Sequence, residues 1–377
     1  MKIRHKVLIV DDEPHIRKLI QVALSRADYA TVEAENAREA LEMLKNERPD
    51  ISLLDLGLPD RDGLELVPLF KQQSDTTLII VSALTFVLAW LTPGDAARVV
   101  LGTNTDPAAY EQLRLELGLD RPLLEQYTSW LAGAVRGDLG NSLLTHEPVA
   151  SVLASRIGVT LSLVVLATIA AGLVGLVLGV TAAVRGGAVA RIIDLVALVG
   201  MSIPVFWLAL MLILLFAVQF TWFPATGYVP FAFDPGSWAN ALVLPVTAAA
   251  CGGVATIAKQ ARGALVDAMG SEYVRALRAN GLPAHRIILS HALRNAAVPV
   301  VTVTSLVMIG LLGGTILVEQ VFALPGLGQL AVTSTGQHDL PVLIGVVVVY
   351  TLIVVVVNLL ADIANGWLSP KMRRASA

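Results

Sequence analysis

The stretch TTLIIVSALTFVLAWLTPGD, residues 76–95, decides the fold because it fits two incompatible structures. Together with the preceding residues, Leu78–Ser82 is typical of a buried strand in a soluble α/β domain. Together with the following residues, the uncharged stretch Leu78–Leu91 is typical of a helix that enters a membrane. Such a helix covers only ~21 Å of a hydrocarbon core of ~30 Å, so it needs flanking residues or neighbouring helices to complete a crossing.

The composition places most of the chain in a membrane. Of 377 residues, 55% are hydrophobic and only 15% are charged, and the mean hydropathy is +0.70. Soluble proteins average roughly 25% charged residues. The net charge of -3 gives no reason to expect binding to nucleic acid. Cys251 is the only cysteine, which excludes an intrachain disulfide and a thiolate metal cluster.

Long uncharged runs predict transmembrane helices in a mainly α, polytopic protein. Each run has about 18 residues or more, the length needed to cross the hydrocarbon core. Pro204 and Pro245 are expected to kink the spans that contain them. With 77–91 included, six spans are predicted: about 77–91, 157–184, 195–218, 241–258, 298–318 and 341–361.

Lysine and arginine predict the sidedness of these spans. The loops 219–240 and 319–340 contain neither residue, so we expect them on the outer face. With six spans, both termini are expected in the cytoplasm of a bacterial-type inner membrane. The basic residues of the predicted cytoplasmic loops and tail are Arg185, Arg191, Lys259, Arg262, Arg275, Arg278, Arg286, Arg294, Lys371, Arg373 and Arg374.

The first 76 residues have a different pattern, βαβαβ. KVLIVDD (6–12) and ISLLDLGLPDRDG (51–63) are short apolar strands that end in acids, with helical spacing between them. Parallel strands bring their carboxyl ends to one edge of the sheet. Asp11, Asp12 and Asp55 are therefore expected to converge there, where they are candidates for holding Mg²⁺.

Residues 1–83 resemble a response-regulator receiver domain, which has a flavodoxin-like fold. The resemblance rests on DDEP, LLDLGLPDRDG and LIIVSA. It implies that Asp11 and Asp12 are the acidic pair, that Asp55 is the phosphoacceptor and that Ser82 is the hydroxyl residue. A receiver continues to a strand that ends in lysine, but no lysine occurs between Lys71 and Lys259. We therefore expect a truncated, cytoplasmic domain over 1–76 whose acidic pocket is inactive.

Residues 77–377 resemble the permease of binding-protein-dependent ABC importers, in the dipeptide, oligopeptide and nickel branch. The resemblance rests on VSALTFVLAWLTPGDAARVVLG (81–102), the segment 113–143, the segment 272–302 and EQVFALPGLGQL (319–330). We favour the helix for residues 78–91, because a strand there would rest on an incomplete sheet. Strongly apolar residues in a helix gain roughly -0.3 to -0.6 kcal/mol each at the membrane centre.

The segment 272–302 is also predicted to form an amphipathic elbow. Ser271 can cap a helix in which Tyr273, Val274 and Leu277 form an apolar stripe. Gly281 permits a reversal and Pro283 starts a second helix. The resemblance implies that this elbow contacts the ATPase. The candidate coupling residues are Glu272, Tyr273, Arg275, Ala276, Leu277, Gly281, Leu282 and Arg286.

Three further features carry weaker expectations. Glu319 meets the last outer loop and is expected to be a solvated helix end, although a gate or rim contact is an alternative. Asp194, near a predicted cytoplasmic boundary, is likewise expected to be solvated. The small residues of GLLGGT (310–315) are expected to pack closely against another helix.

The resemblance implies a permease subunit that imports peptides, nickel or related small solutes. The sequence contains no nucleotide-binding loop, so we expect no enzymatic activity and no cofactor in the permease part, with Mg²⁺ only in the head. The implied partners are a second permease subunit, two ATP-binding subunits, an extracytoplasmic solute-binding protein and membrane lipid. The alternatives are a membrane-tethered phosphorelay receiver, in which phosphorylation of Asp55 regulates transport, and a nonfunctional fusion.

Overall fold

The structure is a computed structural model that describes residues 6–12, 14, 17, 18, 21, 30–47, 49, 51–54, 85, 86, 96–101 and 106–368. The chain divides into two compact units, Met1–Val81 and Ser82–Ala377. Most of the predicted first span, 77–91, lies outside the described residues, as do Asp55 and Ser82. The choice between strand and helix for residues 78–83 therefore stays a prediction.

The first unit contains a parallel sheet of three strands in the order β2-β1-β3. Val7 in the central strand pairs with Thr31 on one side and with Ile51 on the other. Leu8 and Val10 are buried together with alanines of β2 and α2. This arrangement confirms the parallel strands predicted for the head. The elements are β1 (Lys6–Val10), β2 (Ala30–Ala34), α2 (Ala37–Glu47) and β3 (Ile51–Leu54).

The second unit is built from long apolar helices. Four stretches are long and apolar enough to cross a membrane: α8 (Val149–Arg185), α11 (Pro235–Gly270), the continuous stretch Ala284–Val321 and α16 (Leu340–Leu368). Each contains one predicted span. The stretch Ala284–Val321 comprises α13 (Ala284–Ile287), a π-helical segment (Ile288–Ala292) and α14 (Leu293–Val321). α11 stays one continuous helix through Pro245 and packs on α8, α9, α10 and α14.

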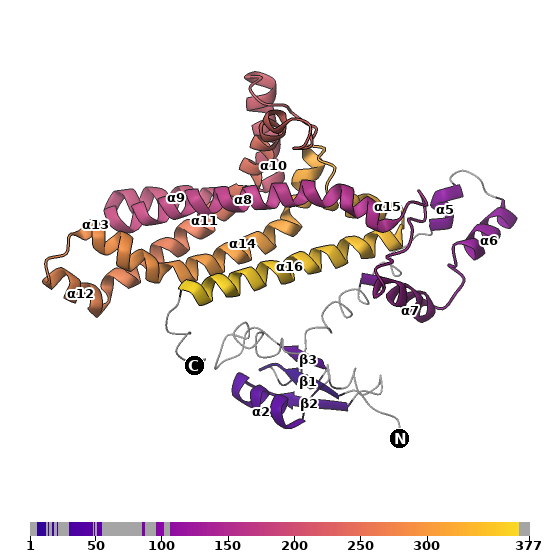
Figure 1. The fold of residues 1–377 in the computed structure, drawn as a ribbon, viewed down its shortest axis with the longest axis horizontal. Helices are drawn as coiled ribbons and strands as arrows, with labels where there is room; N and C mark the ends of the chain where they lie inside the picture. The colour runs from indigo at the N-terminus through magenta and orange to yellow at the C-terminus, as the bar shows by residue number, and fades with distance from the viewer. Residues whose placement is uncertain are drawn as a thin grey trace. The chain divides into compact units, whose positions relative to one another are not determined.

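The predicted span 195–218 is not one straight helix. α9 (Gly187–Ser202) ends before Ile203 and Pro204, and α10 (Val205–Leu212) continues into a π-helical segment, Ile213–Gln219. The two arms are bent by 98°, so α10 stands at a steep angle to α8 and α9 (Figure 1). The kink expected at Pro204 is confirmed, and it divides the predicted span into two helices. Proline removes a backbone donor and disfavours helical geometry in the residue before it.

Small residues set the close approach of α8 and α11. A Cβ atom at Gly179 would lie 2.6 Å from the carbonyl oxygen of Ala258, and one at Gly175 would lie 2.9 Å from Cβ of Ile257. By contrast, among the described residues no neighbouring helix comes within 4 Å of a Cβ at Gly310, Gly313 or Gly314. Leu312 and Thr315 of this stretch are buried, so it packs through these side chains, whereas the three glycines meet none of the described residues.

Short helices lie at both ends of the long ones. α5 (Ala96–Leu101), α6 (Pro107–Glu116), α7 (Leu123–Ala134) and α15 (Leu327–Gly336) lie at the end predicted to be outer, and α12 (Glu272–Ala279) and α13 lie at the opposite end (Figure 1). Thr85 and Phe86 are helical, and Phe86 packs edge-on against Tyr127 with ring centroids 5.6 Å apart.

Candidate functional site

The elbow predicted from the sequence is formed by α12 and α13. α12 follows α11 after the single residue Ser271. Val274 is fully buried and Leu277 half-buried, whereas Tyr273 is 37% exposed. Of the predicted apolar stripe, Val274 is buried in this chain, and Tyr273 lies at its exposed edge. Ser271 does not cap α12 with its side chain, because its hydroxyl donates to the carbonyl oxygen of Ala268 at 2.5 Å.

Gly281 makes the reversal between the two elbow helices. Its φ of +78° lies in the left-handed region, which L-residues enter only at a cost of ~1–2 kcal/mol. The amide of Leu282 donates back to the carbonyl of Leu277 at 3.2 Å, and the amide of Gly281 donates to that of Arg278 at 3.0 Å. These bonds satisfy carbonyls at the end of α12. Pro283 then precedes α13, as predicted.

The elbow presents a basic, solvent-exposed surface and is tied to the next span. The hydroxyl of Tyr273 accepts a hydrogen bond of 2.7 Å from the amide of Asn295, near the start of α14. Leu282 is half-buried. The exposed candidate coupling residues are Glu272, Tyr273, Arg275, Ala276, Gly281 and Arg286. A short, rigid projection of this kind suits recognition in a groove of a partner.

A second polar cluster, which sequence reasoning missed, surrounds Glu319 at the end of α14 predicted to be outer. The expectation of a solvated helix end is wrong, because Glu319 is 0% exposed. The hydroxyl of Thr160 in α8 donates to Oε1 of Glu319 at 2.7 Å. The amide of Gln329 donates to Oε2 at 2.9 Å, and the amide of Leu327 donates to the Thr160 hydroxyl at 2.8 Å. One carboxylate and one hydroxyl thus join α8, α14 and α15.

Two glycines make room for this carboxylate. A Cβ atom at Gly326 would collide with the carboxylate of Glu319, and one at Gly328 would lie 3.0 Å from its Oε2. The amides at the start of α15 carry the positive end of a helix dipole, which stabilises a negative charge. A glutamate followed by the glycine-rich start of a helix, as in EQVFALPGLGQL, is the signal that could have revealed the cluster.

A third polar contact holds the predicted outer loop before α8. The hydroxyl of Ser142 donates to Oδ2 of Asp339 at 2.5 Å, and the amide of Leu143 donates to Oδ1 at 3.2 Å. Ser142 and Asp339 are 3% and 4% exposed. The contact ties a loop that precedes α8 to the residue that precedes α16.

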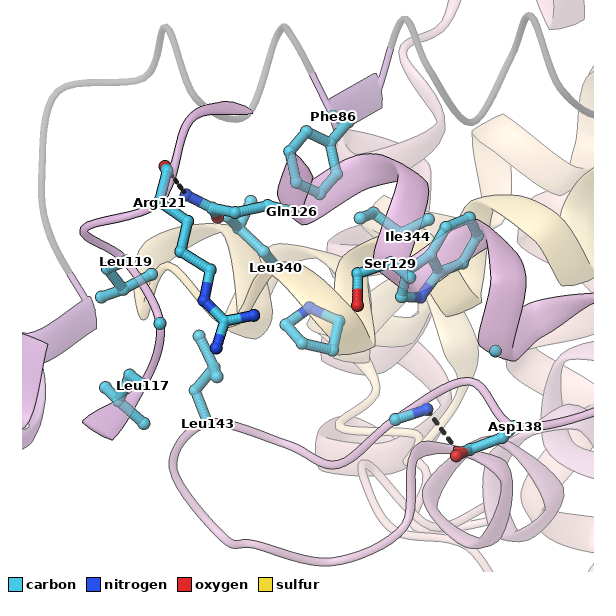
Figure 2. A pocket seen from close by; sticks show the side chains of 15 residues that line it. Phe86, Leu117, Leu119, Arg121, Gln126, Ser129, Asp138, Leu143, Leu340 and Ile344 are labelled. Carbon is cyan, nitrogen blue, oxygen red and sulfur yellow. Dashed lines mark hydrogen bonds between the residues drawn. The ribbon is translucent and has the colours of Figure 1, made fainter. Parts of the chain in front are cut away.

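A cavity of about 310 Å³ lies beside this loop. Figure 2 shows Phe86, Leu340 and Ile344 on its apolar side and Arg121 and Ser129 among its polar residues. The side-chain amide of Gln126 donates to the carbonyl of Arg121 at 2.8 Å. The cavity is therefore built from both the outer helices and the start of α16.

Of the predicted receiver pocket, Asp11 and Asp12 are among the described residues. Asp11 follows β1 and is 9% exposed, and Asp12 beside it is exposed. The guanidinium of Arg17 donates to the backbone carbonyl of Asp11 at 2.6 Å. The described residues contain no group of three metal-ligating side chains, but Asp55 and Ser82 are not among them. Whether Asp11, Asp12 and Asp55 hold Mg²⁺ stays a prediction.

Long apolar helices, a broken span and polar clusters at both ends define a multi-pass membrane protein. Residues 175–374 match the family described as binding-protein-dependent transport system inner membrane component, and residues 71–164 match its N-terminal part. Residues 7–86 match the response regulator receiver domain. The receiver and permease matches overlap over residues 71–86, which includes the first part, 76–86, of the stretch that fits two structures.

Curated proteins give the same result for most of the chain. A protein of Brucella abortus (strain 2308) named as a peptide transport system permease protein is 38% identical over 302 residues, 80% of this chain and 96% of that protein. The glutathione transport system permease protein GsiC of Escherichia coli (strain K12) is 37% identical over 298 residues, 79% of this chain and 95% of that protein.

The chain therefore belongs to the family of binding-protein-dependent transport system inner membrane components. It is a permease subunit of an ABC importer, preceded by a receiver-like head. Both resemblances predicted from the sequence are confirmed.

Proposed function

We propose that this permease imports short peptides or closely related solutes. Similarity along nearly the whole length of relatives named for peptide and glutathione transport supports this solute class. Nickel, which the sequence resemblance also allows, is the alternative. The permease part itself carries out no chemistry and holds no cofactor, so the energy comes from ATP hydrolysis on partner subunits.

The assembly contains a second permease subunit, two ATP-binding subunits and an extracytoplasmic solute-binding protein, and it lies in the inner membrane. The elbow of α12 and α13 contacts an ATP-binding subunit. A buried Val274 anchors the elbow while Arg275 and Arg278 stay exposed, and this supports a docking role. Both termini lie in the cytoplasm, on the same side as the elbow.

Uptake by cells of the native host tests the solute class. We expect deletion of the gene to abolish growth on a di- or tripeptide that supplies a required amino acid, and the full chain to restore it. Labelled nickel uptake, measured in the same strains, is the control. Loss of nickel uptake with intact peptide uptake would contradict the proposal and favour the alternative.

A second candidate function is regulation of transport by the head. The match of residues 7–86 to the receiver family and the strand order β2-β1-β3 favour it. The proposal is that Asp55 accepts a phosphoryl group, with Asp11 and Asp12 helping to hold Mg²⁺. Incubation of the full chain with labelled acetyl phosphate and Mg²⁺ tests it, with Asp55→Asn as control. Equal labelling of both proteins, or none, would contradict this function and leave the head an inactive part of the fusion.

A further inference from the structure

α9 is loosely attached to the rest of the second unit. Only Ala190 is buried among the residues of this 16-residue helix. At one end, Gly186 and Gly187 both have positive φ values, +59° and +51°, and at the other end the helix breaks before Pro204. A helix with little buried surface has low local stability. Because its backbone is irregular at both ends, the position of α9 depends on its side-chain contacts with the neighbouring helices.

A cavity separates part of α9 from its neighbours. It has a volume of about 510 Å³ and is lined by apolar side chains, among them Val174 of α8, Ile193 and Ala197 of α9, and Val254 of α11. Side chains that face a void lose dispersion contacts on that side. Packing in this region therefore holds α9 less firmly than a filled interface would.

α9 approaches α11 at the wall of the cavity and again beyond it. Toward the break, a Cβ atom at Gly200 would lie 3.5 Å from Sγ of Cys251. Toward the other end, the guanidinium of Arg262 donates to the carboxylate of Asp194 in an ion pair. The expectation that Asp194 is merely a solvated helix end is therefore wrong.

The ion pair lies at matching depths in the two helices. Asp194 is seven residues, ~10 Å, from the start of α9 at Gly187, and Arg262 is eight residues, ~12 Å, from the end of α11 at Gly270. Both residues lie just beyond the predicted spans 195–218 and 241–258, so the pair joins the two helices near the predicted cytoplasmic boundary. The side chain of Arg262 is 36% exposed and that of Asp194 is 45% exposed, so the pair lies at the surface of the helix bundle.

α11 is also the helix that the elbow would move. Ser271 alone separates it from α12, and the hydroxyl of Ser271 bonds the carbonyl of Ala268 in the last turn of α11. A displacement of α12 therefore passes directly into α11.

We propose that the Asp194–Arg262 ion pair is the positioning contact through which movement of α11 is transmitted to α9, and so to the broken span at Ile203–Pro204. This inference rests on the proposed function, in which ATP hydrolysis on a partner moves the elbow. Asp194 and Arg262 are positioning residues that touch neither solute nor nucleotide. Without the pair, the remaining packing between α9 and α11 transmits less of this movement.

The first test measures the attachment of α9 and needs neither transport nor partners. Cys251 is the only cysteine and lines the cavity between α9 and α11. In membranes that contain the full chain, we expect Asp194→Asn and Arg262→Gln each to raise the rate of Cys251 modification by a membrane-permeant maleimide about fivefold or more. The exchanged pair Asp194→Arg/Arg262→Asp should restore the slow rate. Arg191→Gln, an exposed arginine of α9, is the matched control and should leave the rate unchanged.

The second test measures coupling in the complex purified from the native host. We expect the single variants to hydrolyse ATP at nearly the normal rate and to move about fivefold less peptide per ATP, with recovery in the exchanged pair. Asp194→Glu, which keeps the charge, should retain coupling even if Asp194→Asn folds poorly. An unchanged Cys251 rate in the single variants, or no recovery in the exchanged pair, would overturn the inference. Failure of the proposed function would show instead as a wild-type complex that transports no peptide.

Discussion

Thr160→Val tests whether the Glu319 cluster holds three helices together. The Thr160 hydroxyl makes two bonds, one to the Glu319 carboxylate and one from the amide of Leu327. Loss of a hydrogen bond to a charged group costs ~1.5–3 kcal/mol, and an unsatisfied buried amide costs ~1–3 kcal/mol. We expect a destabilisation of about 3 kcal/mol, within the range set by these two losses, and therefore a lower thermal midpoint.

Thr168 provides a matched control in the same helix. It is 8% exposed, and its hydroxyl donates only to the carbonyl of Val164 in its own helix, at 2.8 Å. Thr168→Val keeps the same change in shape and should cost less than ~1 kcal/mol. Thermal unfolding of both variants in lipid nanodiscs, followed by exposure of Cys251 to a fluorescent maleimide, gives the comparison.

Equal midpoints for Thr160→Val and Thr168→Val would refute the reasoning, because they would show that the interhelical bonds add nothing to stability. A double variant adds a further check. Thr160→Val combined with Glu319→Gln should cost less than the sum of the single variants, since both remove the same bond. Additive losses would mean that the two side chains act independently.

Four further outcomes are expected. Gly281→Ala should strain the elbow by ~1–2 kcal/mol and lower the peptide-stimulated ATP hydrolysis of the complex, whereas Gly270→Ala, with open space and an ordinary φ, should not. Gly179→Leu should reduce the yield of folded protein, because the added Cβ would lie 2.6 Å from the backbone of α11. Gly172→Leu, where the added Cβ meets open space, should be tolerated. Ser142→Ala should speed proteolysis of the loop 138–148 relative to Ser155→Ala, since only Ser142 bonds Asp339. Hydrogen bonds from Ser237 and Gly236 hold the pKa of Asp234 below its ordinary value of 3.8. The Asp234 cap on α11 therefore stabilises the protein above pH 3.8, and this stabilisation is lost as the pH falls through the lowered pKa. Thermal midpoints of Asp234→Asn and of the wild type, compared between about pH 3 and 7, check this expectation.

Periodicity and charge predicted the parts of the fold that depend on local sequence. Uncharged runs placed α8, α11, α14 and α16, because crossing a membrane demands length and apolar side chains from each segment alone. Gly281 was recognised as the reversal of the elbow because a positive φ is a property of one residue. Pro204 was recognised as a kink for the same reason.

The interactions that were missed join residues far apart in the chain. Glu319 looked solvated because its donors, Thr160 and the start of α15, approach only when α8, α14 and α15 pack together. The ion pair of Asp194 with Arg262 likewise spans two helices. The close approach at Gly175 and Gly179 was likewise missed, since a small residue in a helix does not indicate which neighbour faces it.

The Glu319 cluster restricts which motions can open a passage through the permease. One carboxylate that accepts from both a side chain of α8 and the backbone of α15 makes the outer ends of these helices a single rigid body. Sliding any one of them alone would strand a negative charge away from water. We therefore expect any motion that opens this end of the permease to tilt the three helices together.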